Sequence, residues 1–96
     1  MTRPTFAFAF KSTPEFWALE RHGFKPNTVR IMDAAEAEIA MEGSYAIAFA
    51  GPVQIRVVNT ATGTAFARTL TDISIVGELL GKSIVVFSWR HEDVQS

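Results

Sequence analysis

The sequence predicts an α+β domain: a small β-barrel of five to six mostly antiparallel strands with two short helices. The chain has 96 residues, which suffices for one hydrophobic core, so we expect a single domain over residues 1–96. Several short segments alternate apolar and polar side chains with a period of two, as half-buried strands do. Two other segments carry the capping and turn residues that are typical of short helices.

The amino-terminal segment predicts a strand followed by a helix. Residues 5–10 alternate phenylalanine with alanine or threonine, which is typical of a strand that turns one large face to the core. Thr13 and Pro14 are a favourable N-cap and first-turn pair, so a helix is expected from there to about His22, with Gly23 ending it. The side chains expected to be buried in these two elements are Phe6, Phe8, Phe10, Phe16, Trp17 and Leu19.

The middle of the chain predicts strand, helix and strand. Residues 28–32 alternate polar and apolar side chains. Asp33 can cap a second helix over residues 33–43, which are rich in alanine and glutamate, and Gly43 is a suitable stop. Residues 44–50 alternate again, and we expect a strand there.

The remaining segments predict a meander of strands. Residues 53–57 alternate, and the polar cluster 59–63 ends in glycine, as turns between antiparallel strands often do. The next strand is expected from residue 64 to about 76, and its irregular alternation indicates a bulge. A compact connection over 77–81 then leads to a final strand over 82–89.

Composition excludes several classes of function. The formal net charge is −1, so nucleic-acid binding would need a local basic patch rather than a basic field over the whole protein. No cysteine is present, which excludes disulfides and thiolate chemistry. His22 and His91 are far apart in sequence, and we expect no metal and no cofactor.

No apolar run reaches about 18 residues, so we expect a cytoplasmic protein without a membrane span. We expect residues 91–96 to be a frayed tail.

Reactive side chains and turn chemistry coincide in one stretch, residues 23–30. Pro26 cannot continue a helix, which places Lys25 on a loop, and the period of two then puts Thr28 and Arg30 on one face of the following strand. Two cations and a hydroxyl aimed at one volume can hold a phosphate or a carbonyl oxygen. The alternative is an ordinary solvated surface.

The spacing G-x-K-x-x-T-x-R in this stretch, after an apolar strand and a short helix, resembles the signature of ASCH domains. These are small β-barrels related to the PUA group of RNA-binding modules. Residues 64–72 and 84–89 resemble the second half of such domains, so the resemblance covers most of the chain. It implies a PUA-like fold and an RNA or nucleotide ligand.

A binding function requires only a basic cleft at the mouth of the barrel. The residues expected to face RNA or a nucleotide are Lys25, Thr28, Arg30 and Arg68. Trp17, Trp89 or Tyr45 can stack a base, although large aromatic side chains at such positions more often pack in the core. Arg68 can equally pair with Asp72 on its own strand face.

The resemblance also implies an alternative, because some small ASCH-like enzymes are acetylcytidine amidohydrolases. In those enzymes a lysine and a threonine at the spacing of Lys25 and Thr28 act with a glutamate from a helix inserted late in the chain. The lysine serves as base and the threonine as nucleophile. Here the corresponding connection, 77–81, is brief, and Glu78 is its sole glutamate, so this sequence departs from the enzyme pattern.

A third hypothesis is a protein-binding function. Glu36, Glu38 and Glu42 make the second predicted helix acidic, and an acidic helix can dock on a basic protein surface by charge complementarity. Compact phage proteins include ASCH-like members, and a phage-type inhibitor or host-factor binder would fit this description. The alternative for these residues is a solvated helix face.

Overall fold

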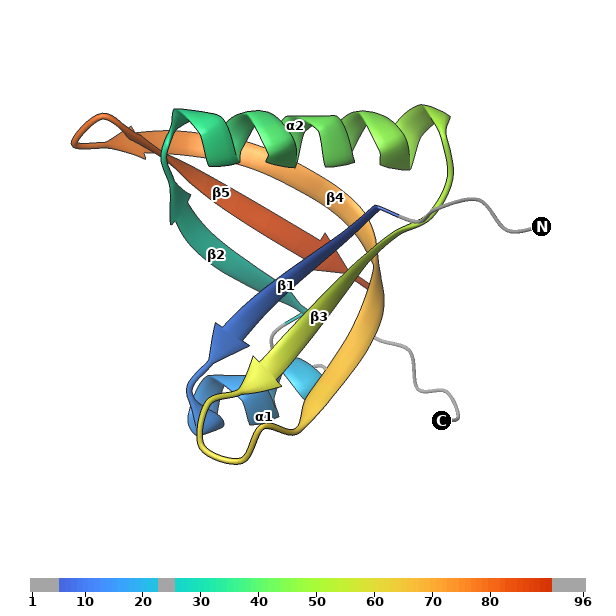
Figure 1. The fold of residues 1–96 in the computed structure, drawn as a ribbon, viewed down its shortest axis with the longest axis vertical. Coiled ribbons are helices and arrows are strands. Elements are labelled where there is room, and N and C mark those ends of the chain that lie inside the picture. Colours follow the sequence, from blue (N-terminus) through green and yellow to red (C-terminus); the bar gives the residue numbers. More distant parts are fainter. Residues whose placement is uncertain (1–5, 23–25, 91–96) are drawn as a thin grey trace.

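The computed structural model describes residues 6–22 and 26–90 as a mixed five-stranded sheet with two helices (Figure 1). The sheet order is β1-β3-β4-β5-β2, with β1 and β3 parallel and the other three pairings antiparallel. The predictions for Gly23, for Lys25 and for the tail 91–96 lie outside these ranges. The elements are β1 (Phe6–Ser12), α1 (Pro14–Arg21), β2 (Asn27–Met32), α2 (Ala34–Phe49), β3 (Val53–Asn59), β4 (Ala65–Leu79) and β5 (Lys82–Trp89).

The sheet curves into a half-barrel because β4 belongs to both of its halves. The first part of β4 pairs with β3 and the second part with β5. Register shifts fall between Leu70 and Asp72 and again between Ile75 and Gly77, where the sequence predicts a bulge, and such irregularities bend a strand. The α+β class and the mostly antiparallel pairing are confirmed, and the sheet is a half-barrel with β1 and β2 as its outer strands.

Helix α1 begins where the sequence predicts, with Thr13 as N-cap and Pro14 in the first turn. Its buried face differs from the prediction. Phe16 and Leu19 are exposed, whereas Glu20 is only 1% exposed. Trp17 is half-buried and donates a hydrogen bond from Nε1 to the carbonyl oxygen of Val57, at 3.0 Å. The helix therefore docks through an indole and a carboxylate rather than through a fully apolar stripe.

Helix α2 is longer than the sequence predicts. Its start is confirmed, since Asp33 and Glu36 form a capping box with hydrogen bonds of 2.8 and 3.1 Å. The predicted strand over 44–50 is wrong, because the helix continues to Phe49. Gly43 does not stop it. This glycine is buried against the ring of Phe8, and the alanine-rich surroundings sustain the helix.

The hairpin between β4 and β5 replaces the compact connection predicted over 77–81. Strand β4 continues to Leu79, and only Leu80 and Gly81 turn the chain, both with positive φ (52° and 81°). Two such residues make the turn that matches the twist of a two-residue hairpin. The final strand, Lys82–Trp89, is as predicted.

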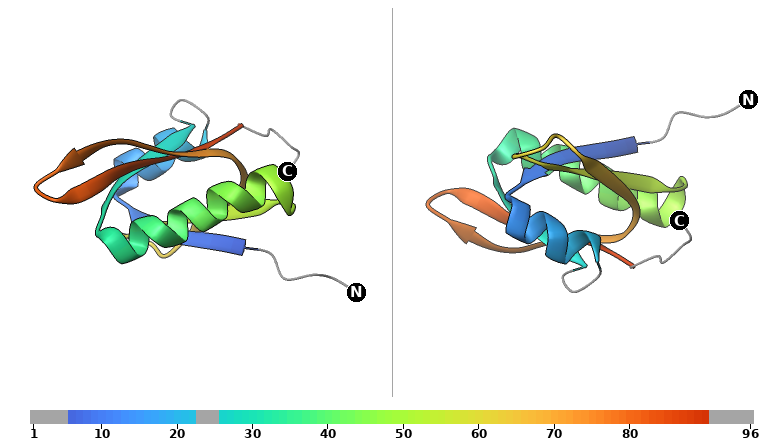
Figure 2. Two further views of the ribbon diagram at one scale, coloured as in Figure 1. Left: turned by 90° about the horizontal axis from the view of Figure 1, so that it is seen from above. Right: turned by 90° about the horizontal axis from the view of Figure 1, so that it is seen from below.

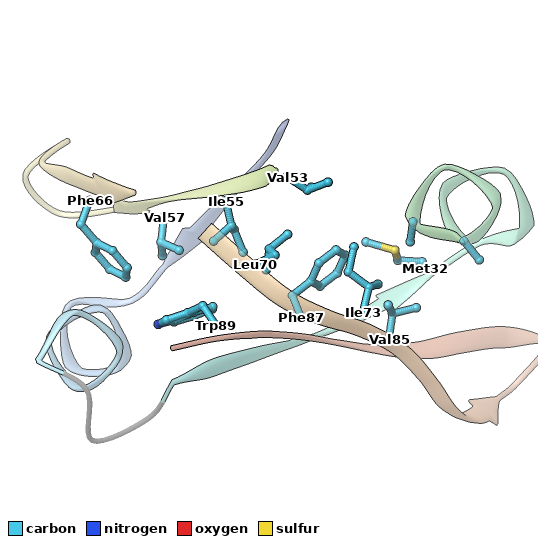
Figure 3. Close-up of a cluster of buried hydrophobic side chains, with 12 residues drawn as sticks. Met32, Val53, Ile55, Val57, Phe66, Leu70, Ile73, Val85, Phe87 and Trp89 are labelled. Atoms are coloured by element: carbon cyan, nitrogen blue, oxygen red, sulfur yellow. The ribbon is translucent and has the colours of Figure 1, made fainter. Parts of the chain in front are cut away.

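The core lies inside the half-barrel, and the two helices close its opposite ends (Figures 1 and 2). Both tryptophans pack inward, Trp89 with 3% of its surface exposed and Trp17 against the cluster, which favours the core interpretation of both over a stacking role. None of the helices in the described ranges is long and apolar enough to cross a membrane. Figure 3 shows the core side chains, and those labelled are Met32, Val53, Ile55, Val57, Phe66, Leu70, Ile73, Val85, Phe87 and Trp89.

Candidate functional site

A pocket of about 350 Å³ opens between β1, α1 and β2, which lies within the size range of small-molecule sites. Thr28 and Arg30 both line it, as the period of two on β2 predicts. Strand β2 buries a polar side chain and exposes apolar ones, which is the reverse of an ordinary amphipathic strand. Thr28 is buried, whereas Val29 and Ile31 are half-exposed. The lining residues are Lys11, Ser12, Thr13, Phe16, Glu20, Thr28, Val29 and Arg30.

Arg30 joins the two outer strands of the half-barrel at this pocket. Its Nη2 donates to the carbonyl oxygen of Lys11 at 2.9 Å and to Oγ of Ser12 at 3.4 Å, and its guanidinium lies 4.7 Å from the centre of the Phe10 ring. Burial lowers the pKa of Arg30, and the negative charge of Glu20 partly offsets that effect. Because an arginine remains protonated at any working pH, the pocket wall carries a fixed positive charge. We call this junction of β1 and β2 the seam.

Glu20 brings a carboxylate to the same pocket from α1. Its side chain is buried, and Oε1 accepts a hydrogen bond from Oγ of Ser12 at 3.0 Å. Sequence reasoning missed this residue because glutamate is rarely buried without a specific partner. The available signal was its spacing, since Glu20 follows Trp17 by three residues and so shares the helix face that docks on the sheet.

Arg68 and Glu78 do not belong to this pocket. Arg68 donates to the carbonyl oxygens of Ala67 and Arg21, both at 2.9 Å, and covers the ring of Phe66. It thus binds the end of α1. The bulge after Leu70 interrupts the alternation that would have put Arg68 and Asp72 on one face.

Glu78 is exposed near the tip of the β4–β5 hairpin, beside Ser83. Thr28 pairs with Phe87, four residues further along β5, which is roughly 13 Å along the strand at the usual rise per residue. The structure therefore separates Glu78 from the threonine that it would have to assist. Lys25 lies outside the described residues.

The accessible part of the pocket combines three kinds of group. Lys11 supplies a cation, Thr13 a hydroxyl, and Phe16 an aromatic ring with 52% of its surface exposed. The third stacking candidate, Tyr45, lies on α2, away from these residues. Within residues 6–22 and 26–90, no group of three or more histidine, aspartate or glutamate side chains is arranged to hold a metal ion.

The pocket is therefore a mixed-charge recess in which a buried carboxylate and a half-buried guanidinium lie beside side chains that can stack and donate hydrogen bonds. Comparison with known proteins adds no relative to this description: no family model, no curated protein and no solved structure matches the chain.

Proposed function

We propose that this domain binds single-stranded RNA or a nucleotide in the seam pocket, as an ASCH-like module would. One observation carries the proposal. Thr28 and Arg30, the two described residues of the sequence motif, line one recess together with an exposed aromatic ring, Phe16, and a lysine, Lys11. Stacking rings beside cations are the usual means of binding single strands.

The charges in the pocket orient the ligand. The buried carboxylate of Glu20 disfavours a phosphate in the interior and accepts hydrogen bonds from the N–H groups of a base. The phosphate then lies at the rim, beside Lys11. The base stacks on Phe16, and Thr28 donates or accepts one hydrogen bond inside. Arg68 has no part in this arrangement.

Fluorescence anisotropy with a labelled single-stranded RNA oligomer tests the proposal. Phe16→Ala is expected to weaken binding by about 1–3 kcal/mol, the range found for loss of one stacking ring. Lys11→Gln is expected to weaken binding and to reduce the slope of log K against log salt by about one. The matched controls are Leu80→Ala, an exposed apolar residue, and Lys82→Gln, an exposed lysine. Equal losses in the control variants would refute a site at the seam.

Amide hydrolysis is a second candidate, favoured by the carboxylate that shares the pocket with Thr28. In this scheme Lys25 removes the hydroxyl proton of Thr28, whose oxygen forms a bond to the amide carbonyl carbon. The C–N bond breaks, and the Glu20 carboxylate passes the proton that Lys25 has taken up to the departing amine. Water then hydrolyses the threonine ester, which releases the acid and restores the hydroxyl group of Thr28. Glu20 takes the place that the sequence assigned to Glu78.

Incubation with acetylated cytidine, followed by absorbance, distinguishes the two functions. If the domain is a hydrolase, Thr28→Val and Glu20→Gln abolish the release of free cytidine, and Glu78→Gln retains it. If a preparation binds RNA but releases no free cytidine, the result supports the binding function and not the hydrolase. Turnover lost in Glu78→Gln but kept in Glu20→Gln would contradict the assignment of Glu20.

A further inference from the structure

Helix α2 packs on the sheet through its smallest side chains. Ala37, Ala40 and Gly43 are buried, and a Cβ added at Gly43 would lie 2.7 Å from the ring of Phe8. That spacing admits no larger residue without movement of the ring. The helix approaches the sheet closely along this line, with Met41 and Ile47 packed against the core beside it, whereas Tyr45 and Phe49 are left exposed.

Two aromatic rings stand out on the outer face of α2. Tyr45 and Phe49 are 70% and 81% exposed, and they contact each other edge to face with ring centres 5.5 Å apart. Burial of these rings against a partner would remove a large apolar surface from water, which the isolated chain leaves exposed at both positions. Exposed aromatic side chains that lie together are typical of interaction surfaces.

We propose that the outer stripe of α2, formed by Glu38, Glu42, Tyr45 and Phe49, docks into an apolar groove of a partner protein that is flanked by lysine or arginine. The four residues follow one another at spacings of four, three and four, so they lie along one side of the helix. This is the anchor pattern with which a helix fills a groove. The function is separate from nucleotide binding, because the seam pocket contains none of these residues.

Charge identifies the partner. Glu38 and Glu42 are exposed on the stripe, and residues 34–49 contain no lysine or arginine. Nucleic acid and anionic membranes are repelled by such a surface, whereas a basic protein groove is attracted. A second copy of this chain would bury the glutamates of both helices with no cation from either helix, which is unfavourable. Glu36 contributes less than the sequence indicated, since its side chain is held in the capping box.

Two synthetic amphipathic peptides with the same leucine pattern test the proposal, one with lysine and one with glutamate at its polar positions. NMR spectra of ¹⁵N-labelled protein should show that the lysine peptide shifts the amides of the stripe and that the glutamate peptide does not. The double variant Tyr45→Ser/Phe49→Ser should weaken binding at least about tenfold, which corresponds to about 1.4 kcal/mol. Glu38→Gln/Glu42→Gln should flatten the salt dependence.

The controls are Leu80→Ser and Glu78→Gln, which remove an exposed apolar side chain and an exposed carboxylate from the hairpin instead. Circular dichroism confirms that each variant keeps its helix content. Equal binding of the two peptides, shifts centred away from α2, or equal losses in the controls would overturn the proposal. So would sedimentation as a dimer that Tyr45→Ser/Phe49→Ser dissociates, because the stripe would then be covered by a second copy.

Discussion

Replacing Phe87 by alanine is expected to lower the free energy of unfolding by about 3–5 kcal/mol, the usual loss for a fully buried phenylalanine. No part of this side chain is exposed. Its ring contacts those of Phe8 and Phe10, with centres 5.0 and 4.9 Å away. Phe87, labelled in Figure 3, lies on β5 and thereby links the two halves of the half-barrel, since β1 pairs with β3 in one half and β5 pairs with β2 in the other.

Urea unfolding followed by circular dichroism measures this loss. Phe87→Leu keeps most of the volume and should lose much less, which supplies a folded variant if Phe87→Ala does not fold. The control is Leu80→Ala at the hairpin tip, where 94% of the side chain is exposed and a change within about 0.5 kcal/mol is expected. A loss below about 1 kcal/mol for Phe87→Ala would contradict the packing described here.

Replacing Arg30 by methionine is expected to weaken both the fold and the proposed binding. The variant keeps an unbranched chain near Phe10 but loses the hydrogen bonds to Lys11 and Ser12. Hydrogen bonds to charged groups contribute about 1.5–3 kcal/mol, so a loss of stability in this range is expected. Because Arg30 joins β1 to β2, the pocket wall should also open, and RNA affinity should fall at least about tenfold.

Arg56→Met is the matched control for Arg30, since Arg56 is exposed on β3 and does not line the pocket. Urea unfolding and RNA anisotropy are measured on both variants. Retention of wild-type stability by Arg30→Met would show that the seam does not depend on this side chain. An equal loss of RNA affinity in Arg56→Met would show that general positive charge, rather than the pocket, retains the RNA.

The strands were the most predictable part of the fold. Alternation located β2, β3 and β5, and irregular alternation located the bulge in β4, because one buried face imposes a period of two on the sequence. The second half of α2 was not predictable in this way. Tyr45, Ile47 and Phe49 alternate with smaller residues as in a strand, yet the helix leaves Tyr45 and Phe49 exposed. The alternation of these residues therefore does not mark the buried face of a strand.

The candidate site was predictable only in part. Thr28 and Arg30 converge because two residues that are two apart on a strand must share a face. Arg68 contacts the end of α1 and does not line the pocket, an arrangement that the alternation of β4 alone does not indicate. Glu20 lies on α1, and Ser12 lies on β1, which is not a neighbour of β2 in the sheet. Only the three-dimensional path of the chain brings both residues to the pocket that Thr28 lines.

The most direct test is an NMR titration of ¹⁵N-labelled protein with a single-stranded RNA oligomer, with duplex DNA as the comparison. If the pocket binds RNA, the largest amide shifts fall at Ser12, Phe16, Thr28 and Arg30, and duplex DNA leaves these amides unchanged. Shifts confined to the hairpin or to α2, with the seam residues unmoved at saturating RNA, would contradict it.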